Sequence, residues 1–101
     1  MPRILKQDAE RLLANVPVEH AFRCCYGRVL HNLRELKEAL EDMLDDSYAY
    51  HVRQEKNDFS EWIKHTVGDQ KLARDLEKSL NRTQAAKRVA ARIAFLSGKL
   101  V

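Results

Sequence analysis

His51 and Asp58 are the two residues whose types could perform acid–base chemistry together. Histidine changes its charge near neutral pH, and a neighbouring carboxylate can orient its ring. His51 lies late in one predicted helix and Asp58 at the start of the next, so the intervening turn could bring them within hydrogen-bonding reach. No nucleophile or second acid has a defined place nearby. We favour a structural interpretation, in which His51 sits near a helix C-terminus and Asp58 binds backbone amides.

A second group of residues carries side chains of the types that bind zinc: His20, Cys24, Cys25 and His31. Their spacing lacks the two-residue gap that lets paired ligands hold one ion. Adjacent cysteines point in different directions on a helix or a strand. Because cysteine is among the most buried residue types, a role in the core is the better interpretation. We expect no metal site, and nothing in the sequence indicates a cofactor.

The third candidate is a basic surface with an aromatic residue at its centre, near the C-terminus. On a helical wheel Arg88, Arg92 and Lys99 fall close together, and Phe95 projects beside them. The apolar stripe of the same helix lies elsewhere on the wheel: Val89, Ala90, Ile93, Leu96 and Leu100. An aromatic flanked by bases can bind single-stranded nucleic acid or anchor a protein interface. Alternatively, the N-terminal helix folds over Phe95 and hides it. These four residues are our candidate binding site.

The elements that position these residues follow from apolar spacing. Apolar residues at three- and four-residue steps predict an amphipathic helix over residues 1–16, ending near Asn15 because Pro17 follows. Residues 18–30 show no clean period, and we expect a helical turn followed by an irregular or strand-like piece. No alternating run rich in valine and isoleucine is long enough to predict a sheet.

Capping signals divide the middle of the chain. Asn32 with Glu35 forms a capping box before an apolar stripe of Leu33, Leu36, Leu40, Met43 and Leu44. Asp45 or Asp46 is expected to cap a short helix. Asp58 with Glu61 predicts a second cap and box. The helix that follows has a buried face of Phe59, Trp62, Ile63 and Val67.

Gly68 is expected to end that helix in a left-handed conformation, and Asp69 to begin the next. The inner face of this next helix comprises Leu72, Ala73, Leu76 and Leu80. We expect Asn81 to end it and Thr83 to cap the last helix, which runs to about Ser97. Residues 1–101 are thus predicted to form one all-α domain, a compact bundle of about five to six short helices.

A set of spaced pairs resembles a family of small all-helical domains of unknown function, met mainly in archaea and in bacteria with reduced genomes. The pairs are Tyr50-His51, Asp58-Phe59, Trp62-Ile63, Gly68-Asp69 and Leu72-Ala73. Upstream, Gly27-Arg28, Asn32-Leu33 and Glu35-Leu36 match the first half of that family. The resemblance covers residues 22–97 as a family-like core. It implies a compact helical module with no established activity, so no catalytic residues carry over.

Composition limits the remaining possibilities. The chain has 101 residues, 45% hydrophobic and 33% charged, which suits one folded domain. No apolar run approaches the roughly 20 residues of a membrane span. Charged residues interrupt any secretory segment, and the adjacent cysteines do not suggest a disulfide framework, so we expect a cytoplasmic protein. Acids outnumber bases ten to five in residues 33–69, whereas bases outnumber acids eight to two in residues 70–101.

These observations predict a non-catalytic protein-interaction or adaptor module that binds a protein partner or itself. Its charge segregation and the absence of a convergent catalytic group favour this over an enzyme. Nucleic-acid binding through the basic C-terminal helix is the alternative, since a sequence pI near 9.0 permits it. Neither a small-molecule substrate nor a membrane partner is indicated.

Overall fold

The computed structural model describes residues 4–24 and 27–101, and this part of the chain is predominantly helical. The all-α prediction is confirmed, with two small antiparallel hairpins added to the helices. The elements are α1 Lys6–Leu13, η1 Val18–His20, β1 Phe22–Arg23, β2 Val29–Leu30, α2 Leu33–Asp42, α3 Asp45–His51, β3 Val52–Arg53, β4 Lys56–Asn57, α4 Asp58–Trp62, η3 Ile63–Val67, α5 Gln70–Glu77 and α6 Arg82–Gly98.

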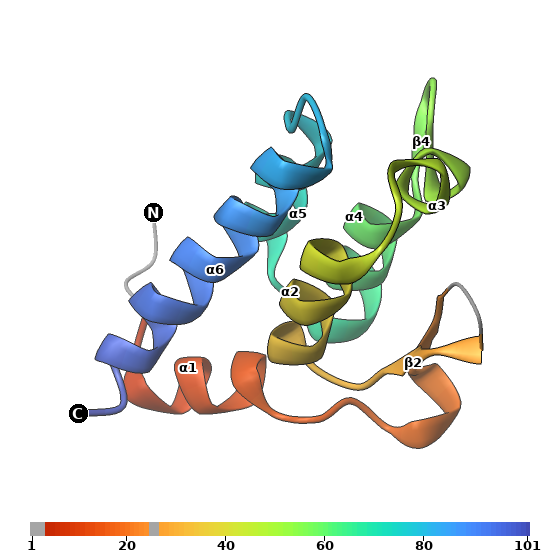
Figure 1. Ribbon diagram of the computed structural model, residues 1–101. Coiled ribbons are helices and arrows are strands. Elements are labelled where there is room, and N and C mark those ends of the chain that lie inside the picture. The colour runs from red at the N-terminus through yellow and green to blue at the C-terminus, as the bar shows by residue number, and fades with distance from the viewer. Residues whose placement is uncertain (1–3, 25–26) are drawn as a thin grey trace.

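The long helix α6 organises the fold. It packs against α2 on one side and α5 on the other, and α1 crosses its C-terminal half (Figure 1). Leucines supply much of the core between these helices, with Phe59 and Ile63 contributed by α4 and η3. Small residues of α6, Ala85 and Ala86, are also buried, which lets neighbouring helices approach closely. Within the described ranges, none of the helices has the length and apolar character needed to cross a bilayer.

The segment before α2 follows the expectation for residues 18–30. A single 3₁₀ turn is followed by strands β1 and β2, in which Phe22 pairs with Leu30 and Arg23 with Val29. Strands of two residues are too short to show an alternating pattern, which explains why the sequence predicted no sheet. Helix α1 ends at Leu13, two residues before the predicted end.

The capping box at the start of α2 is present with one partner displaced. The Glu35 backbone N–H donates to the Asn32 side-chain oxygen at 2.8 Å, as expected. The Glu35 carboxylate accepts from the backbone N–H of His31, at 2.7 Å, instead of that of Asn32. This backbone bond, followed by the side-chain bond to His31, lowers the pKa of Glu35. The carboxylate therefore serves the helix start in its charged form.

Three predicted helix starts are wrong. Asn57, not Asp58, caps α4 and accepts from the Ser60 backbone N–H at 3.0 Å. Asn81, not Thr83, caps α6. Both asparagines have extended backbones, as an N-cap requires. Their short side chains therefore accept hydrogen bonds from the first helical amides in place of the side chains of Asp58 and Thr83. Helix α3 has no side-chain cap, since Leu44 occupies its N-cap position.

Two leucines assigned to inner faces are exposed. Leu44 is 60% exposed and Leu80 is 85% exposed. Each was predicted to lie within a helix but follows the end of the observed one, because α2 ends at Asp42 and α5 ends at Glu77. The 3.6-residue period that placed them inward stops where the helix stops.

Gly68 adopts the predicted left-handed conformation, with φ of 91°. The preceding helix widens at its end into η3, a π-type segment, in which the backbone N–H groups of Gly68 and Asp69 donate to the Ile63 carbonyl at 2.7 and 3.1 Å. Asp69 then caps α5 by accepting from the Leu72 backbone N–H. This junction turns the chain from η3 into α5 within two residues.

We expect Gly68→Ala to lower the free energy of unfolding by about 1–2 kcal/mol, because a Cβ is strained in the left-handed region. The added Cβ would also lie 3.3 Å from the Arg11 Nη1 atom. Gly98→Ala is the matched control, since Gly98 ends α6 and nothing lies within 4 Å of its added Cβ. Urea unfolding followed by circular dichroism measures both. Equal stability of the two variants would contradict the prediction.

Candidate functional site

The His51 and Asp58 side chains meet across the β3–β4 hairpin. His51 Nδ1 lies 3.1 Å from Asp58 Oδ2, and Lys56 Nζ lies 3.7 Å from the other oxygen, Oδ1. The His51 ring is buried and packs against Phe22 and Phe59, each with a centroid distance of 5.2 Å. Asp58 thus orients an imidazole within an aromatic cluster, in place of the predicted contact with backbone amides.

A hollow of about 300 Å³ beside His51 is lined by Arg23, Cys24, Ser47 and Tyr50. In the described residues, Asp58 is the side chain that hydrogen-bonds His51. His51 is therefore a buried ring oriented by one carboxylate.

The residues with zinc-binding side chains do not converge. His31 Nδ1 lies 2.9 Å from a Glu35 carboxylate oxygen, and the His20 carbonyl accepts from Trp62 Nε1 at 2.9 Å. Cys25 lies outside the described residues. In the part of the chain that is described, no three histidine, cysteine or acidic side chains are placed to hold a metal ion.

Arg92 faces inward, contrary to its position on the helical wheel. Its side chain is 9% exposed and makes two hydrogen bonds to Asp69, from Nε at 2.7 Å and from Nη2 at 3.1 Å. Asp69 is itself buried while it caps α5. The side of α6 opposite the apolar stripe packs against the start of α5, so the guanidinium is enclosed between two helices. In the sequence, the one sign of this ion pair was the acidic residue Asp69. Its predicted role as a helix cap already explained the carboxylate, so no cationic partner was sought for it.

Arg88 also connects α6 to α5. Its Nη1 donates to the Asp75 carbonyl at 2.6 Å and lies 3.3 Å from the Ser79 hydroxyl oxygen. A guanidinium there satisfies a carbonyl at the C-terminal end of α5, where helical carbonyls lack partners. Two of the three predicted basic residues are therefore engaged in holding the fold together.

Phe95 and Lys99 keep the position expected of a binding surface. Phe95 is 46% exposed, and its ring lies 5.1 Å from Lys99 Nζ and 5.2 Å from Arg92 Cζ. Cations at this distance over an aromatic face interact favourably with it. The N-terminal helix α1 lies beside Phe95 without hiding it. The alternative that this helix would cover Phe95 is therefore only partly correct.

Phe95 lines a groove of about 540 Å³ where α1, the start of α5 and α6 meet. We call this the Phe95 groove. Figure 1 shows α1 crossing the C-terminal half of α6, which forms this end of the molecule. The groove residues are Ile4, Asp8, Arg11, Leu12, Gly68, Asp69, Gln70, Lys71, Arg74, Arg92 and Phe95. The sequence had indicated the α6 wall of this groove and, as an alternative, the N-terminal helix over Phe95, but not the contribution of α5.

The Phe95 groove has an apolar floor and a basic rim. Arg11 and Lys71 have acidic neighbours, Asp8 at 3.9 Å and Asp75 at 2.7 Å respectively. Arg74 is exposed and forms no ion pair within the described residues. Since Arg92 compensates the buried Asp69 carboxylate, the rim carries excess positive charge. The groove thus suits a ligand with an apolar group and negative charge.

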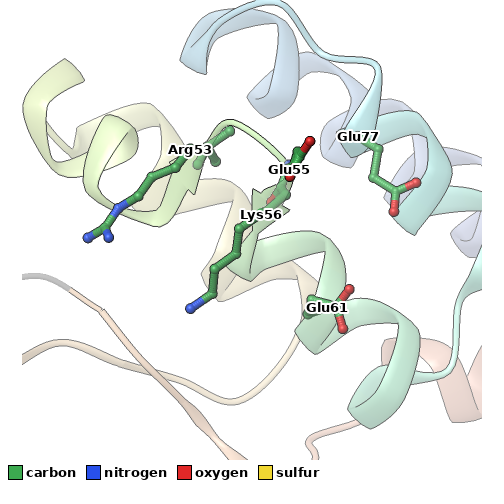
Figure 2. A pocket seen from close by; sticks show the side chains of 7 residues that line it. Arg53, Glu55, Lys56, Glu61 and Glu77 are labelled. Atoms are coloured by element: carbon green, nitrogen blue, oxygen red, sulfur yellow. The ribbon is translucent and has the colours of Figure 1, made fainter.

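Two other hollows are more polar. One, of about 270 Å³, lies beside the β3–β4 hairpin and is lined by Arg53, Glu55, Lys56, Glu61 and Glu77 among others. Figure 2 shows the Arg53 and Lys56 side chains extending away from Glu77, so its charges do not converge on one point. The other, of about 520 Å³, lies between α3 and the turn before α6.

Comparison with known proteins places the domain in a family without assigning an activity. The model of a family described as a family of unknown function, DUF5752, matches residues 21–94. Helix α1 and Phe95 lie outside this match. Neither the curated proteins nor the solved structures include a significant match. Because the match covers most of the 101 residues, the chain belongs to the DUF5752 family of unknown function.

Proposed function

We propose that this protein is a non-catalytic protein-interaction module, and that the Phe95 groove is its docking surface. Its partner carries an acidic segment with one apolar side chain as anchor. The observation that carries this proposal is a half-exposed Phe95 on an apolar floor, surrounded by the basic side chains of Arg11, Lys71 and Arg74.

The chemistry of the groove matches the general anatomy of protein interfaces. Burial of apolar area favours association, and aromatic residues in well-packed pockets supply much of the binding energy. Charged groups at the rim contribute chiefly to the association rate and to the choice of partner. A basic rim therefore selects acidic segments, while Phe95 provides the contact that holds them.

Nucleic-acid binding through α6 remains the second candidate. Its support is the cation–aromatic arrangement of Lys99 and Phe95, which could stack a base beside a neutralised phosphate. However, Arg88 and Arg92 direct their guanidinium groups to α5, which leaves Lys99, over the Phe95 ring, as the one of the three that is not bonded to α5. Protein docking therefore has the stronger basis.

We also propose that the protein acts in the cytoplasm and has no catalytic role. The adjacent Cys24 and Cys25 do not suggest the disulfide framework of small secreted domains. The proposal of no enzymatic role rests on His51, whose ring nitrogen partner in the described residues is the single carboxylate of Asp58.

The docking proposal predicts that the ¹⁵N-labelled protein binds a designed amphipathic peptide of leucine and glutamate, with amide shifts concentrated at the Phe95 groove. The matched peptide of leucine and lysine should not bind there. Phe95→Ala should weaken binding of the acidic peptide at least about tenfold, as loss of an aromatic anchor does. Val18→Ala is the control variant, because Val18 is 78% exposed and lies outside the groove.

The same titration separates the alternatives. Equal shifts from both peptides, or no groove shifts at millimolar peptide, would refute docking of an acidic segment. A single-stranded RNA oligonucleotide provides the nucleic-acid arm. Binding that weakens steeply with salt and is lost in Lys99→Ala would favour the second candidate instead.

A further inference from the structure

The corner between α2 and α3 combines an exposed apolar residue with a dense set of acids. We call residues 41–46 the Leu44 corner. Helix α2 ends at Asp42 and α3 begins at Asp45, and Leu44 between them is 60% exposed. Met43 is buried and anchors the corner to the core. The remaining side chains of the corner are exposed carboxylates: Glu41, Asp42, Asp45 and Asp46.

Nothing within the fold accounts for a leucine at position 44. It occupies the N-cap of α3, where serine, threonine, aspartate or asparagine would accept a hydrogen bond from the first amides of the helix. Leu44 offers no such bond and leaves most of its side chain in solvent. Asp45 and Asp46, by contrast, suit the first turn of α3 because its amides carry partial positive charge. The exposed apolar side chain is therefore the feature that an interaction would explain.

The charges of the corner complement those of the Phe95 groove. Internal ion pairs hold three of its carboxylates, with Lys37, Arg28 and Arg82 as the cationic partners. Asp46 forms no ion pair within the described residues. Arg74 on the groove rim is likewise without an ion pair there. One chain thus presents an unpaired carboxylate beside an apolar anchor and, elsewhere, an unpaired guanidinium beside an apolar floor.

We propose that the Phe95 groove receives the Leu44 corner of a second copy of this chain. The inference rests on the proposed docking function and identifies the occupant. Leu44 enters the groove against Phe95, and the carboxylates of the corner face the basic rim. Leu44 and Phe95 are both exposed in the monomer, so association requires no unfolding.

The two surfaces lie too far apart to meet within one chain. Asp45 of the corner bonds to Arg82 at the first turn of α6, at 2.8 Å. Phe95 follows on the same helix roughly 20 Å further along its axis, at 1.5 Å per residue. Contact between a groove and a corner is therefore between copies. A two-fold pair makes both contacts reciprocally and closes as a dimer, whereas a one-way, head-to-tail contact leaves one groove and one corner open, so that assemblies extend or close into rings.

The test is sedimentation velocity over a range of protein concentrations at low and high salt. The wild-type chain should form species larger than a monomer as concentration rises, and added salt should weaken the association because charged rims contribute. Phe95→Ala and Leu44→Ser should each reduce the association constant at least about tenfold. Leu44→Ser introduces a favourable N-cap, so its folding is preserved. Val18→Ala should associate like the wild type.

Mixing the two variants gives the decisive result. Phe95→Ala keeps an intact corner and Leu44→Ser keeps an intact groove, so an equimolar mixture should form a one-to-one heterodimer that does not extend. Larger species from wild type without a heterodimer in the mixture would overturn the contact between groove and corner.

Self-association and binding of the acidic peptide can fail independently of each other. A wild-type chain that remains monomeric at millimolar concentration and low salt overturns self-docking. If the leucine–glutamate peptide still binds the Phe95 groove, the docking function stands and its acidic partner is another protein. If the peptide also fails to bind, both proposals are wrong.

Discussion

Replacing Trp62 by alanine is expected to lower the free energy of unfolding by about 3–5 kcal/mol, the usual cost of removing a large buried aromatic side chain. Trp62 is 7% exposed, packs edge-on against Phe22 at 5.8 Å, and donates from Nε1 to the His20 carbonyl. The indole thereby holds the segment before α2 onto α4. Urea unfolding followed by circular dichroism measures the loss without relying on the fluorophore that is removed.

Two further variants at aromatic positions calibrate this result. Trp62→Phe keeps an aromatic ring but loses the bond to His20, so about 1–2 kcal/mol should be lost. Tyr50→Ala should cost less than about 1 kcal/mol, since Tyr50 is 64% exposed and its ring contacts Arg53 at the surface. A Trp62→Ala loss as small as that of Tyr50→Ala would show that the indole contributes little to the core.

The aromatic cluster around Phe59 explains why this region tolerates a buried histidine. Phe59 stacks with Phe22 at 5.1 Å and with Tyr48 at 5.9 Å, and His51 packs against its ring. Burial raises the pKa of the Tyr48 hydroxyl, as expected for a side chain held away from water. Asp58 satisfies one ring nitrogen of His51 at the edge of this cluster. The histidine is thus retained by packing as well as by its carboxylate.

The helical architecture could be predicted because its signals are local. Apolar spacing identified the buried faces that contain Leu36, Trp62 and Leu72, and a single glycine marked the turn at residue 68. The two hairpins could not be predicted in the same way. Their strands are two residues long, and pairing such as that of Phe22 with Leu30 depends on contacts made after the chain folds back.

Helix starts were predicted less well, because several neighbouring residues could each serve as a cap. In the sequence Asn57-Asp58 both side chains can accept an amide hydrogen bond, and the backbone leaving β4 decides in favour of Asn57. The displaced aspartate then pairs with His51. Sequence reasoning had weighed this pair and preferred the capping role, since the path of the hairpin between the two residues was not known.

The candidate site was predicted in part. The wheel placed Phe95 outside the apolar stripe, and it is exposed. The same wheel placed Arg92 outside as well, yet a helix has more than one neighbour and the far side of α6 meets α5. Arg92 and Asp69 are 23 residues apart, and the periodicity of a single helix cannot predict a contact between residues of two helices. A position of the N-terminal helix over Phe95 was among the alternatives, but which α1 residues line the groove was beyond local signals.

Arg92→Met is expected to lower the free energy of unfolding by about 3–5 kcal/mol, because it leaves the Asp69 carboxylate buried without its cation. The side chains of Arg92 and Asp69 are 9% and 1% exposed, so solvent cannot compensate the lost partner. Methionine preserves much of the apolar stem, which limits the contribution of lost packing. The loss should appear as a lower urea midpoint with an unchanged slope.

The double variant Asp69→Asn/Arg92→Met separates buried charge from capping. Asparagine remains neutral and can still accept the Leu72 amide bond, so the double variant should recover a large part of the stability lost in Arg92→Met. The stability of Asp69→Asn alone should lie between those of the wild type and Arg92→Met. This substitution weakens the bonds to Arg92 without removing the cap of α5. A double variant no more stable than Arg92→Met would mean that packing of the guanidinium, and not charge compensation, holds α6 against α5. Because the pair joins two walls of the Phe95 groove, its electrostatics would then matter little for the shape of the docking surface.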